Sequence, residues 1–438
     1  MSNATLPEEL VALILSHLNA KKDASTVHAL RLSNRMLCRL ATPYLYRTIH
    51  VGLPTSGNYM KLDDATRDKA TVKHLIDHPA WTGYVKELKL TQSHENMIKD
   101  GDEVRKQQQR QDPGEDLESS VMDALEAGFP DNARVAFVLL KCENVQVFES
   151  TMSPAMGRYV SRTIDDVTAN HLQARLNPSQ AVSKSLPLSK LSKLSIHGGH
   201  YEISLEKTRS FLCLPALLYL RISGLADNQQ FFERKPPKHD DIVRNTNRLT
   251  LVLDSCMLSG VGLDTLLATC PNARSLTIRW RIGLWNEHFR NEEACDVLRK
   301  RGGKLEELVY DTDGLYAFRC RETAMNTFGS FADLNLKRFA IQKAFFDHLL
   351  VLPEAGRPAQ LAAAALLPKG LKELHVLGVE DEDMSAIMAL VGTHVQPGLK
   401  KSACVPFHHY SFYDHGGMRH HKSIDYNRVG GFELKTTE

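Results

Sequence analysis

One spacing of apolar residues recurs along most of the chain: an apolar residue, two others, a second apolar residue, one other, and a third. The apolar-x-apolar half of this spacing is typical of a short strand whose side chains alternate between two faces. The middle positions of the successive occurrences are Leu88, Val145, Leu194, Leu220, Leu251, Leu276, Leu308, Phe339 and Leu374. From Leu194 onward they are 25 to 35 residues apart, which indicates a repeated structural unit.

Segments with helical signals lie between the predicted strands. The segment that ends at Arg301 is followed by Gly302 and Gly303, a pair that favours a helix C-terminus. The predicted helices cover residues 117–127, 131–141, 260–269, 292–301, 359–367 and 383–391. Strands and helices that alternate at a steady spacing predict parallel strands, with each unit burying its apolar face against its neighbours.

This organisation resembles leucine-rich repeats, whose regular members recur every 20–29 residues or so. The position that such repeats fill with Asn or Cys carries Cys256 in one unit, but residues such as Gly199 and Leu225 in others. The predicted fold class is therefore α/β: an N-terminal helical region, then an irregular leucine-rich-repeat-like solenoid, a curved parallel sheet with helices outside. No continuous ladder of buried polar side chains is expected. An ordinary α/β domain with several buried strands is the alternative.

Two segments interrupt the repeats. Residues 91–118 are charged, rich in Gln and poor in large apolar residues, a composition that predicts a disordered insertion. Residues 226–241 form a second, surface insertion. The predicted repeat domain spans residues 52–405, and residues 406–438 form a His-rich tail or cap.

The first fifty residues carry apolar positions at helical instead of strand spacing. Leu10, Leu13, Ile14 and Leu18 form one stripe, and Pro7 suits the first position of that helix. A second helix would start at Asp23 or Ser25 and carry Val27 and Leu30. A third would have Ser33 as its cap, Met36, Leu37 and Leu40 on one face, and Pro43 at its end.

Such a helical region is too small to bury all of its apolar residues by itself. A fully buried Leu contributes about 1.5–3 kcal/mol, so a row of exposed ones favours binding to a partner. Packing of the stripe against the rest of the chain explains the pattern equally well, and periodicity alone leaves both interpretations open.

Residues 1–51 resemble an F-box, the helical motif that docks a protein onto the Skp-type adaptor of cullin–RING ubiquitin ligases. The matching segments are Leu6-Pro7-Glu8-Glu9-Leu10, residues 14–18, residues 30–35, and Leu37 with Leu40-Ala41. Two departures are Cys38, where many members carry Trp, and Ser33-Asn34 in place of Val-Cys. The resemblance implies an adaptor and, through it, cullin as partners. The adaptor-binding residues that it implies are Leu6, Pro7, Leu10, Ile14, Leu15, Leu18, Leu30, Leu37 and Leu40.

The repeats would then hold a target protein on the face of the sheet that points away from the core. Residues between and beside the buried pairs of each strand belong to that face. The target-binding candidates are Tyr219, Arg221, Asp254, Arg279, Asp311 and His375. Binding energy concentrates in few interface residues, so under a third of such a face is expected to matter.

Composition narrows the choice of partners and compartment. The 54 Lys and Arg residues balance 52 Asp and Glu, which gives no electrostatic footprint for nucleic acid or an anionic membrane. The 8 cysteines are scattered without a C-x-x-C pair, as expected of free thiols in a reducing compartment. No secretory signal or spanning segment is recognisable, so the cytoplasm or the nucleus is expected.

Catalytic sequence motifs are absent: there is no P-loop, no G-x-G-x-x-G, no H-E-x-x-H and no G-x-S-x-G. Asp311-Thr312-Asp313-Gly314 lacks the further acidic residues of a calcium loop and predicts a turn. The histidines between His408 and His421 follow no metal-site spacing, so a surface tail or cap is preferred to a metal site. The sequence thus predicts a non-enzymatic, substrate-recruiting ligase subunit without cofactor or metal. The alternatives are a repeat scaffold whose helical region is only a terminal cap, and an enzyme with an unrecognised site.

Overall fold

The structure is a computed structural model of the whole chain. It describes residues 7–18, 23–51, 62–90, 117–126, 131–151, 158–176, 186–198, 203–227, 245–281, 291–312, 330–343, 367–379, 401–414 and 417–424. Two compact units make up the chain. Unit 1 comprises Met1–Tyr201 with Cys213–Leu217, and unit 2 comprises Glu202–Leu212 with Leu218–Glu438.

Unit 1 begins with three helices, α1 (Glu8–His17), α2 (Ala24–Ser33) and α3 (Arg35–Tyr46), which we call the head. Its core consists of buried apolar residues, one or two from each helix: Val11, Leu15, Val27 and Ala41. The hydroxyl of Tyr44 in α3 donates a hydrogen bond to the carbonyl of Ala12 in α1 over 3.1 Å. The predicted three-helix region is therefore present.

The ends of the head helices differ from the sequence expectation by small shifts. Asn34, not Ser33, caps α3: its side-chain oxygen accepts from the Leu37 N–H at 2.8 Å, while the Ser33 hydroxyl donates to the Ala29 carbonyl inside α2. Pro43 does not end α3, which continues to Tyr46. Tyr46 is buried against aromatic neighbours, so tertiary packing outweighs the local cost of a proline inside a helix.

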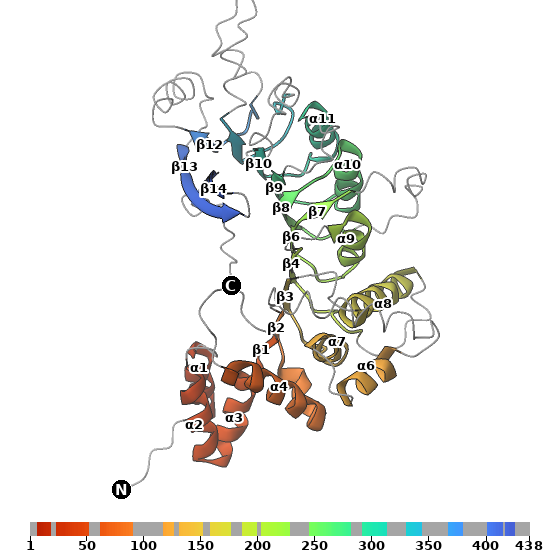
Figure 1. Ribbon diagram of the computed structural model, residues 1–438, viewed down its shortest axis with the longest axis vertical. Coiled ribbons are helices and arrows are strands. Elements are labelled where there is room, and N and C mark those ends of the chain that lie inside the picture. Colours follow the sequence, from red (N-terminus) through yellow and green to blue (C-terminus); the bar gives the residue numbers. More distant parts are fainter. Residues whose placement is uncertain are drawn as a thin grey trace, which may run out of the picture. The chain divides into compact units, whose positions relative to one another are not determined.

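The sheet of unit 1 has four parallel strands in chain order: β1 (Thr48–Val51), β2 (Glu87–Leu90), β3 (Val147–Thr151) and β4 (Lys193–His197). Their register aligns one row of buried residues, Ile49, Leu88, Phe148 and Leu194. The remaining elements of this unit are α4 (Leu62–Asp77), the 3₁₀ helix η1 (Pro79–Tyr84), α6 (Leu117–Glu126), α7 (Asp131–Lys141) and α8 (Arg158–Leu176). In Figure 1, α7 and α8 lie along one side of β2–β4.

Two details of the repeat pattern in unit 1 were predicted wrongly. In the second occurrence the middle residue is Phe148, not Val145, because Phe148 pairs with Leu88 and Leu194. The apolar triplet Cys142, Val145 and Val147 fits the spacing in sequence, because the position that pairs with Leu90 carries the polar Ser150. In addition, Thr48–Val51 is the first strand of the sheet, although the sequence grouped it with the helical region.

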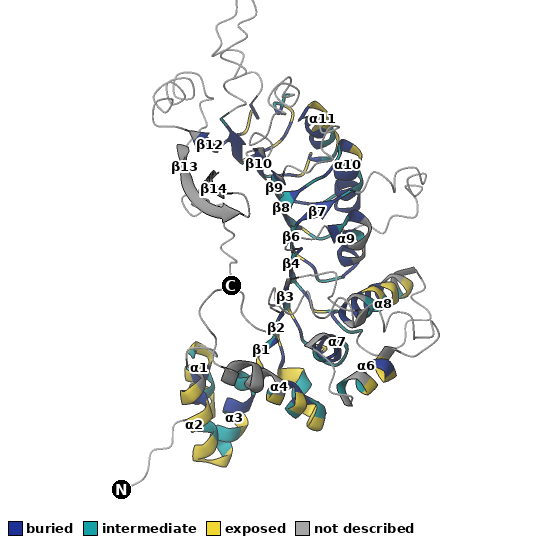
Figure 2. Ribbon diagram, in the orientation of Figure 1, coloured by how far each residue is buried: buried dark blue, intermediate teal, exposed yellow. Residues whose placement is uncertain are grey.

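Unit 2 continues the pattern with parallel strands in chain order, β6 (Tyr219–Ser223), β8 (Thr250–Cys256), β9 (Ser275–Arg281), β10 (Glu307–Thr312), β11 (Arg338–Gln342) and β12 (Glu373–Val379). One row of fully buried residues crosses them: Leu220, Leu251, Leu276, Leu308, Phe339 and Leu374. Helices α9 (Leu205–Leu212), α10 (Gly260–Thr269) and α11 (Asn291–Arg301) lie along one side (Figure 1). Figure 2 shows buried strands and exposed outer helix faces.

These features confirm the predicted fold class, a mixed α/β fold of leucine-rich-repeat type with parallel strands. The predicted helices at 117–127, 131–141, 260–269 and 292–301 correspond to α6, α7, α10 and α11. Those at 359–367 and 383–391 lie outside the described residues, apart from Leu367. Residues 91–116 and 228–241 of the two predicted insertions also lie outside them.

The ends of the two predicted insertions belong to regular elements. Leu117 and Glu118 open α6, and Ala226 ends β7 (Leu225–Ala226), which pairs with β5 (Ile203–Ser204). The predicted tail begins inside a strand: β13 (Lys401–Asp414) pairs in parallel with β12 and antiparallel with β14 (Gly417–Ile424). Among the described residues, no helix has the length and apolar character needed to cross a membrane.

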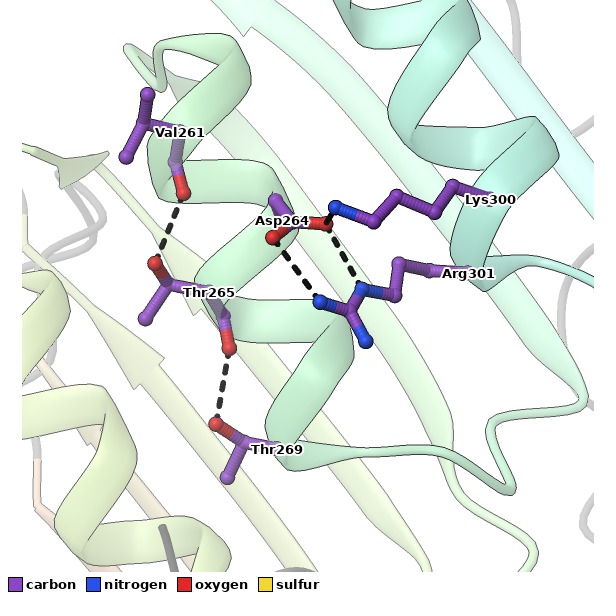
Figure 3. A network of polar contacts seen from close by, with 6 residues as sticks. All are labelled: Val261, Asp264, Thr265, Thr269, Lys300 and Arg301. Carbon is purple, nitrogen blue, oxygen red and sulfur yellow. Dashed lines mark hydrogen bonds and ion pairs between the residues drawn. The ribbon is translucent and has the colours of Figure 1, made fainter. Parts of the chain in front are cut away.

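Helices α10 and α11 show how neighbouring repeats are joined outside the sheet. Ser259 caps α10 by accepting from the Gly262 N–H, and the Gly302 N–H bonds the Leu298 carbonyl just after α11. Between the helices, the Arg301 guanidinium donates two hydrogen bonds to Asp264, at 2.8 and 3.2 Å (Figure 3). The ammonium of Lys300 lies 3.4 Å from the same carboxylate. The pKa of Asp264 is lowered, first by its hydrogen bond from Arg301.

Candidate partner-binding surfaces

Helix α1 of the head is apolar on two faces. Val11 and Leu15 point into the core of the head and are buried. Leu10, Leu13 and Ile14, spaced as neighbours on a helix surface, are 46%, 55% and 52% exposed. Leu32 in α2 is 74% exposed. These four side chains, which we call the head's exposed apolar set, need a covering surface to leave water.

The adaptor-binding residues implied by the sequence fall into three groups. Leu10 and Ile14 are exposed, and Pro7 is exposed at the N-cap position of α1. Leu15 is fully buried, so in this structure it stabilises the head and is not accessible to a partner. Leu6 lies outside the described residues. The half-buried remainder pack against the core of the head: Leu18, Leu30, Leu37 and Leu40.

In the sequence, Leu13 belongs to the apolar stripe of α1 but is not among the predicted adaptor-binding residues, and neither is Leu32. Helical spacing could have separated the two faces of α1, because Val11 and Leu15 are four residues apart, as are Leu10 and Ile14. Helical spacing could not show which of these two faces of α1 is covered by α2 and α3.

The second candidate surface is the face of unit 2's sheet that bears Arg221, Asp254 and Arg279, which we call the polar face. Arg221 and Arg279 both bind the Asp254 carboxylate: Arg221 Nε donates to one oxygen over 2.7 Å, and Arg279 Nη1 donates to the other. Asp254 is nearly buried, whereas the two arginines remain partly exposed. Tyr219 lies beside Arg221, and the pKa of Tyr219 is raised, chiefly by burial. One carboxylate thus fixes two guanidinium groups from the strands on either side of it.

The structure does not bring all the predicted target-binding residues to an accessible surface. Asp311 occupies the register position next to Arg279 but is buried. His375 lies three strands beyond β9, on β12, and is also buried. The accessible members are therefore Tyr219, Arg221 and Arg279, with Asp254 between them.

Burial increases along the polar face from β6 towards β12. Arg221 is partly exposed, and the residues that follow it in the same row are buried: Val252, Thr277, Val309, Ala340 and His375. Because Val252 and Thr277 are buried, a partner could reach β6 and β9 of this face through Arg221 and Arg279, which flank Asp254.

Ion pairs join successive strands of unit 2 at the ends where the strands begin. Glu306 accepts from Arg274 over 2.7 Å and from Lys337 on its other side, and Glu307 pairs with Arg338. The pKa of Glu306 is lowered, chiefly by the hydrogen bond from Lys337. The sequence held a signal for this ladder, because Arg274, Glu306 and Lys337 occupy the same place in three successive repeats.

Neither thiol nor metal chemistry emerges in the described part of the chain. Burial raises the pKa of Cys142 to about 12 and also raises the pKa of Cys256 and Cys270, so these thiols stay protonated and unreactive. Across the described ranges, no group of three His, Cys, Asp or Glu side chains is placed to hold a metal ion.

No protein-family model matches the sequence, and the comparison with curated proteins found no match. Among solved structures, a chain in the crystal structure of the yeast Rad7–Elc1 complex matches with 11% sequence identity. The match covers 90% of this chain and 81% of that one, with a TM-score of 0.35.

Proposed function

We propose that this protein is the substrate-recruiting subunit of a Skp–cullin–F-box ubiquitin ligase. Its head would dock the adaptor, and the polar face of its repeats would hold a target protein. The observation that supports this most is the second apolar face of α1, formed by Leu10, Leu13 and Ile14. A small helical unit that leaves such a face uncovered is suited to bind an apolar groove.

The proposed role needs no catalytic residue in this chain. Ubiquitin transfer would occur on the other subunits, and this protein would hold the target close to them, which replaces a bimolecular encounter by a nearly unimolecular one. Cys38, Cys142, Cys256 and Cys270 form no disulfide, which is consistent with a role in the cytoplasm or the nucleus. Imaging of the fluorescently tagged chain tests the compartment, and secretion would contradict it.

The adaptor-docking proposal is tested by co-expression with a Skp-type adaptor and measurement of the complex by size exclusion and calorimetry. The variant is Leu13→Glu with Ile14→Glu, because both side chains are exposed and their replacement leaves the core of the head intact. Two buried aliphatic side chains contribute about 3–6 kcal/mol to such a contact. Affinity should therefore fall by at least about 100-fold.

A matched control is Val261→Glu, which changes an equally exposed apolar residue on α10, outside the head. It should leave adaptor binding unchanged. Leu15→Ala is a different control, because it opens a cavity in the head and should lower its stability by about 2–5 kcal/mol. Wild-type affinity in the Leu13/Ile14 variant would disprove docking through α1.

The second candidate is a repeat scaffold whose head is only a terminal cap, as solenoids require. The observation in its favour is that the head leads directly into β1 and that Tyr46 of α3 packs on Trp81 of η1. A monodisperse chain that binds no Skp-type adaptor would support the scaffold and exclude the ligase role.

A further inference from the structure

The junction between the head and the sheet of unit 1 contains four aromatic rings in mutual contact. Tyr46 ends α3, His74 lies in α4, His78 follows α4, and Trp81 lies in η1. The Trp81 ring stacks on His78 with centroids 4.5 Å apart, and lies 4.9 Å from His74 and 5.1 Å from Tyr46. The two histidines are 4.8 Å apart, edge to face. These contacts pack α3, α4 and η1 against one another.

Arg31 of α2 joins this aromatic cluster from the head. Its guanidinium carbon lies 5.7 Å from the centroid of the Trp81 ring, within the range of a cation–π interaction. The same positive charge opposes the rise in the pKa of Tyr46 that burial of this side chain causes. One planar cation of the head therefore contacts the segment that leads into β2.

The covalent connection of the head to the sheet is short and by itself permits rotation. A single residue, Arg47, separates α3 from β1. Its carbonyl accepts hydrogen bonds from the N–H groups of Lys86 and Glu87, both over 2.9 Å, which fixes the position of this link. A contact away from Arg47 is needed to fix the angle of the head, and Arg31 on Trp81 makes such a contact.

We propose that Arg31 is a positioning residue that fixes the angle of the head, and with it the direction of the exposed apolar set, relative to the sheet of unit 1. The contact between Arg31 and Trp81 is given by the geometry of the structure. Its role, which is to hold a docked adaptor at a set angle to the repeats, rests on the proposed function. The residues on either side of Arg31 in α2 have different roles. Leu30 packs on the core of the head and Leu32 is exposed, while Arg31 points to η1.

The experiment measures the distance between two spin labels in the full chain, without adaptor. Cysteines replace Arg35 in the head and Asp123 in α6, two exposed residues, and Cys38, Cys320 and Cys404 are changed to Ala. The same background then carries Arg31→Ala, Arg31→Lys or Arg39→Ala. Arg39 is the matched control, because it is also a head arginine but pairs with Glu8 inside the head. Adaptor affinity is measured separately for each variant.

The expected result is one narrow distance distribution for the unmodified background and for Arg39→Ala. Arg31→Ala should broaden or shift this distribution, and Arg31→Lys should largely restore it, because a Lys ammonium is also attracted to the Trp81 ring. Binding of the isolated adaptor should remain within a factor of about two in all variants, since Arg31 is not in the exposed apolar set.

An unchanged distribution in Arg31→Ala would overturn the proposal. So would loss of helical structure in the head of that variant, seen by hydrogen exchange of α2 and α3, because Arg31 would then serve folding and not orientation. If no variant and no wild-type chain binds the adaptor, the proposed function fails while the spin-label result still decides the role of Arg31.

Discussion

Asp264 shows how one residue links two repeats through charge. It accepts two hydrogen bonds from Arg301 and has Lys300 within 3.4 Å (Figure 3). Asp264→Asn should lower the stability of unit 2 by about 1–2 kcal/mol at pH 7, because a charge-assisted, partly buried contact is lost. Urea unfolding followed by tryptophan fluorescence measures the difference.

The pH dependence of this loss has a defined sign. The pKa of Asp264 is lowered in the folded state, so its stabilising effect is present above the ordinary Asp pKa and disappears as pH falls through the folded value. The difference between wild type and Asp264→Asn should therefore vanish in strong acid. Asp296→Asn, which removes a more exposed ion pair with Arg299, should change little at either pH. Equal effects of the two variants would contradict this account.

Asn34 and Ser33 illustrate the limit of sequence reasoning at the scale of one residue. Both are good capping residues, and only the geometry shows that Asn34 accepts from the Leu37 N–H. Asn34→Ala should destabilise the head by about 1 kcal/mol, and Ser33→Ala by less, because Ser33 only bonds a carbonyl of its own helix. Hydrogen exchange in α3 measures both, and the reverse order would show that Ser33 is the cap.

The strands were predictable because each one repeats the same buried positions. The spacing located β2, β4, β6, β8, β9, β10, β11 and β12, since apolar-x-apolar sequences at regular intervals have few alternative explanations. It misplaced β3 by three residues, because Ser150 occupies a position of β3 that is apolar in the other strands. It missed the short pair β5 and β7, because two-residue strands carry no periodicity.

The sequence predicted which residues share a face in the candidate sites, but not which of them are exposed. The spacing placed Arg221, Asp254 and Arg279 on one face, and the structure joins them. It gave no sign that Asp311 and His375 are buried, because burial on that face depends on what lies above it and not on the strand itself. For the same reason it could not show which of Leu10 and Leu15 in α1 is buried.

Close packing at the start of α10 gives a prediction for that element. A Cβ on Gly262 would overlap the carboxylate of Asp227, which accepts hydrogen bonds from the Ser259 N–H and hydroxyl. Gly262→Ala should therefore cost about 1–3 kcal/mol by overpacking. Gly303, where an added Cβ meets nothing within 4 Å, provides the control: Gly303→Ala should stay within about 0.5 kcal/mol of wild type in thermal unfolding. Equal losses would disprove the role of the Asp227 contact.

At the scale of the whole molecule, the pairing of β1 with β2 determines at which residue a chain without the head should begin. β1 pairs with β2, and its Ile49 and Val51 lie beside Leu88 and Leu90. A chain that begins at Arg47 keeps β1, whereas one that begins at Gly52 exposes the edge of β2 with its apolar row. The shorter chain should associate or precipitate more readily in size exclusion and light scattering, because exposed strand edges pair with other chains. Identical behaviour of the two chains would show that β1 does not protect the edge.

The charge ladder at the start of the strands of unit 2 constrains how this chain can evolve. If the segment carrying β10 were lost by an in-frame deletion, β9 would meet β11, and Arg274 would face Lys337 without Glu306 between them. Ser275 would at the same time replace Glu307 as the neighbour of Arg338. Like charges on adjacent strands are destabilising. The repeats therefore resemble each other in their apolar spacing but are not interchangeable, and lineages descended from this protein should retain their number while individual residues drift.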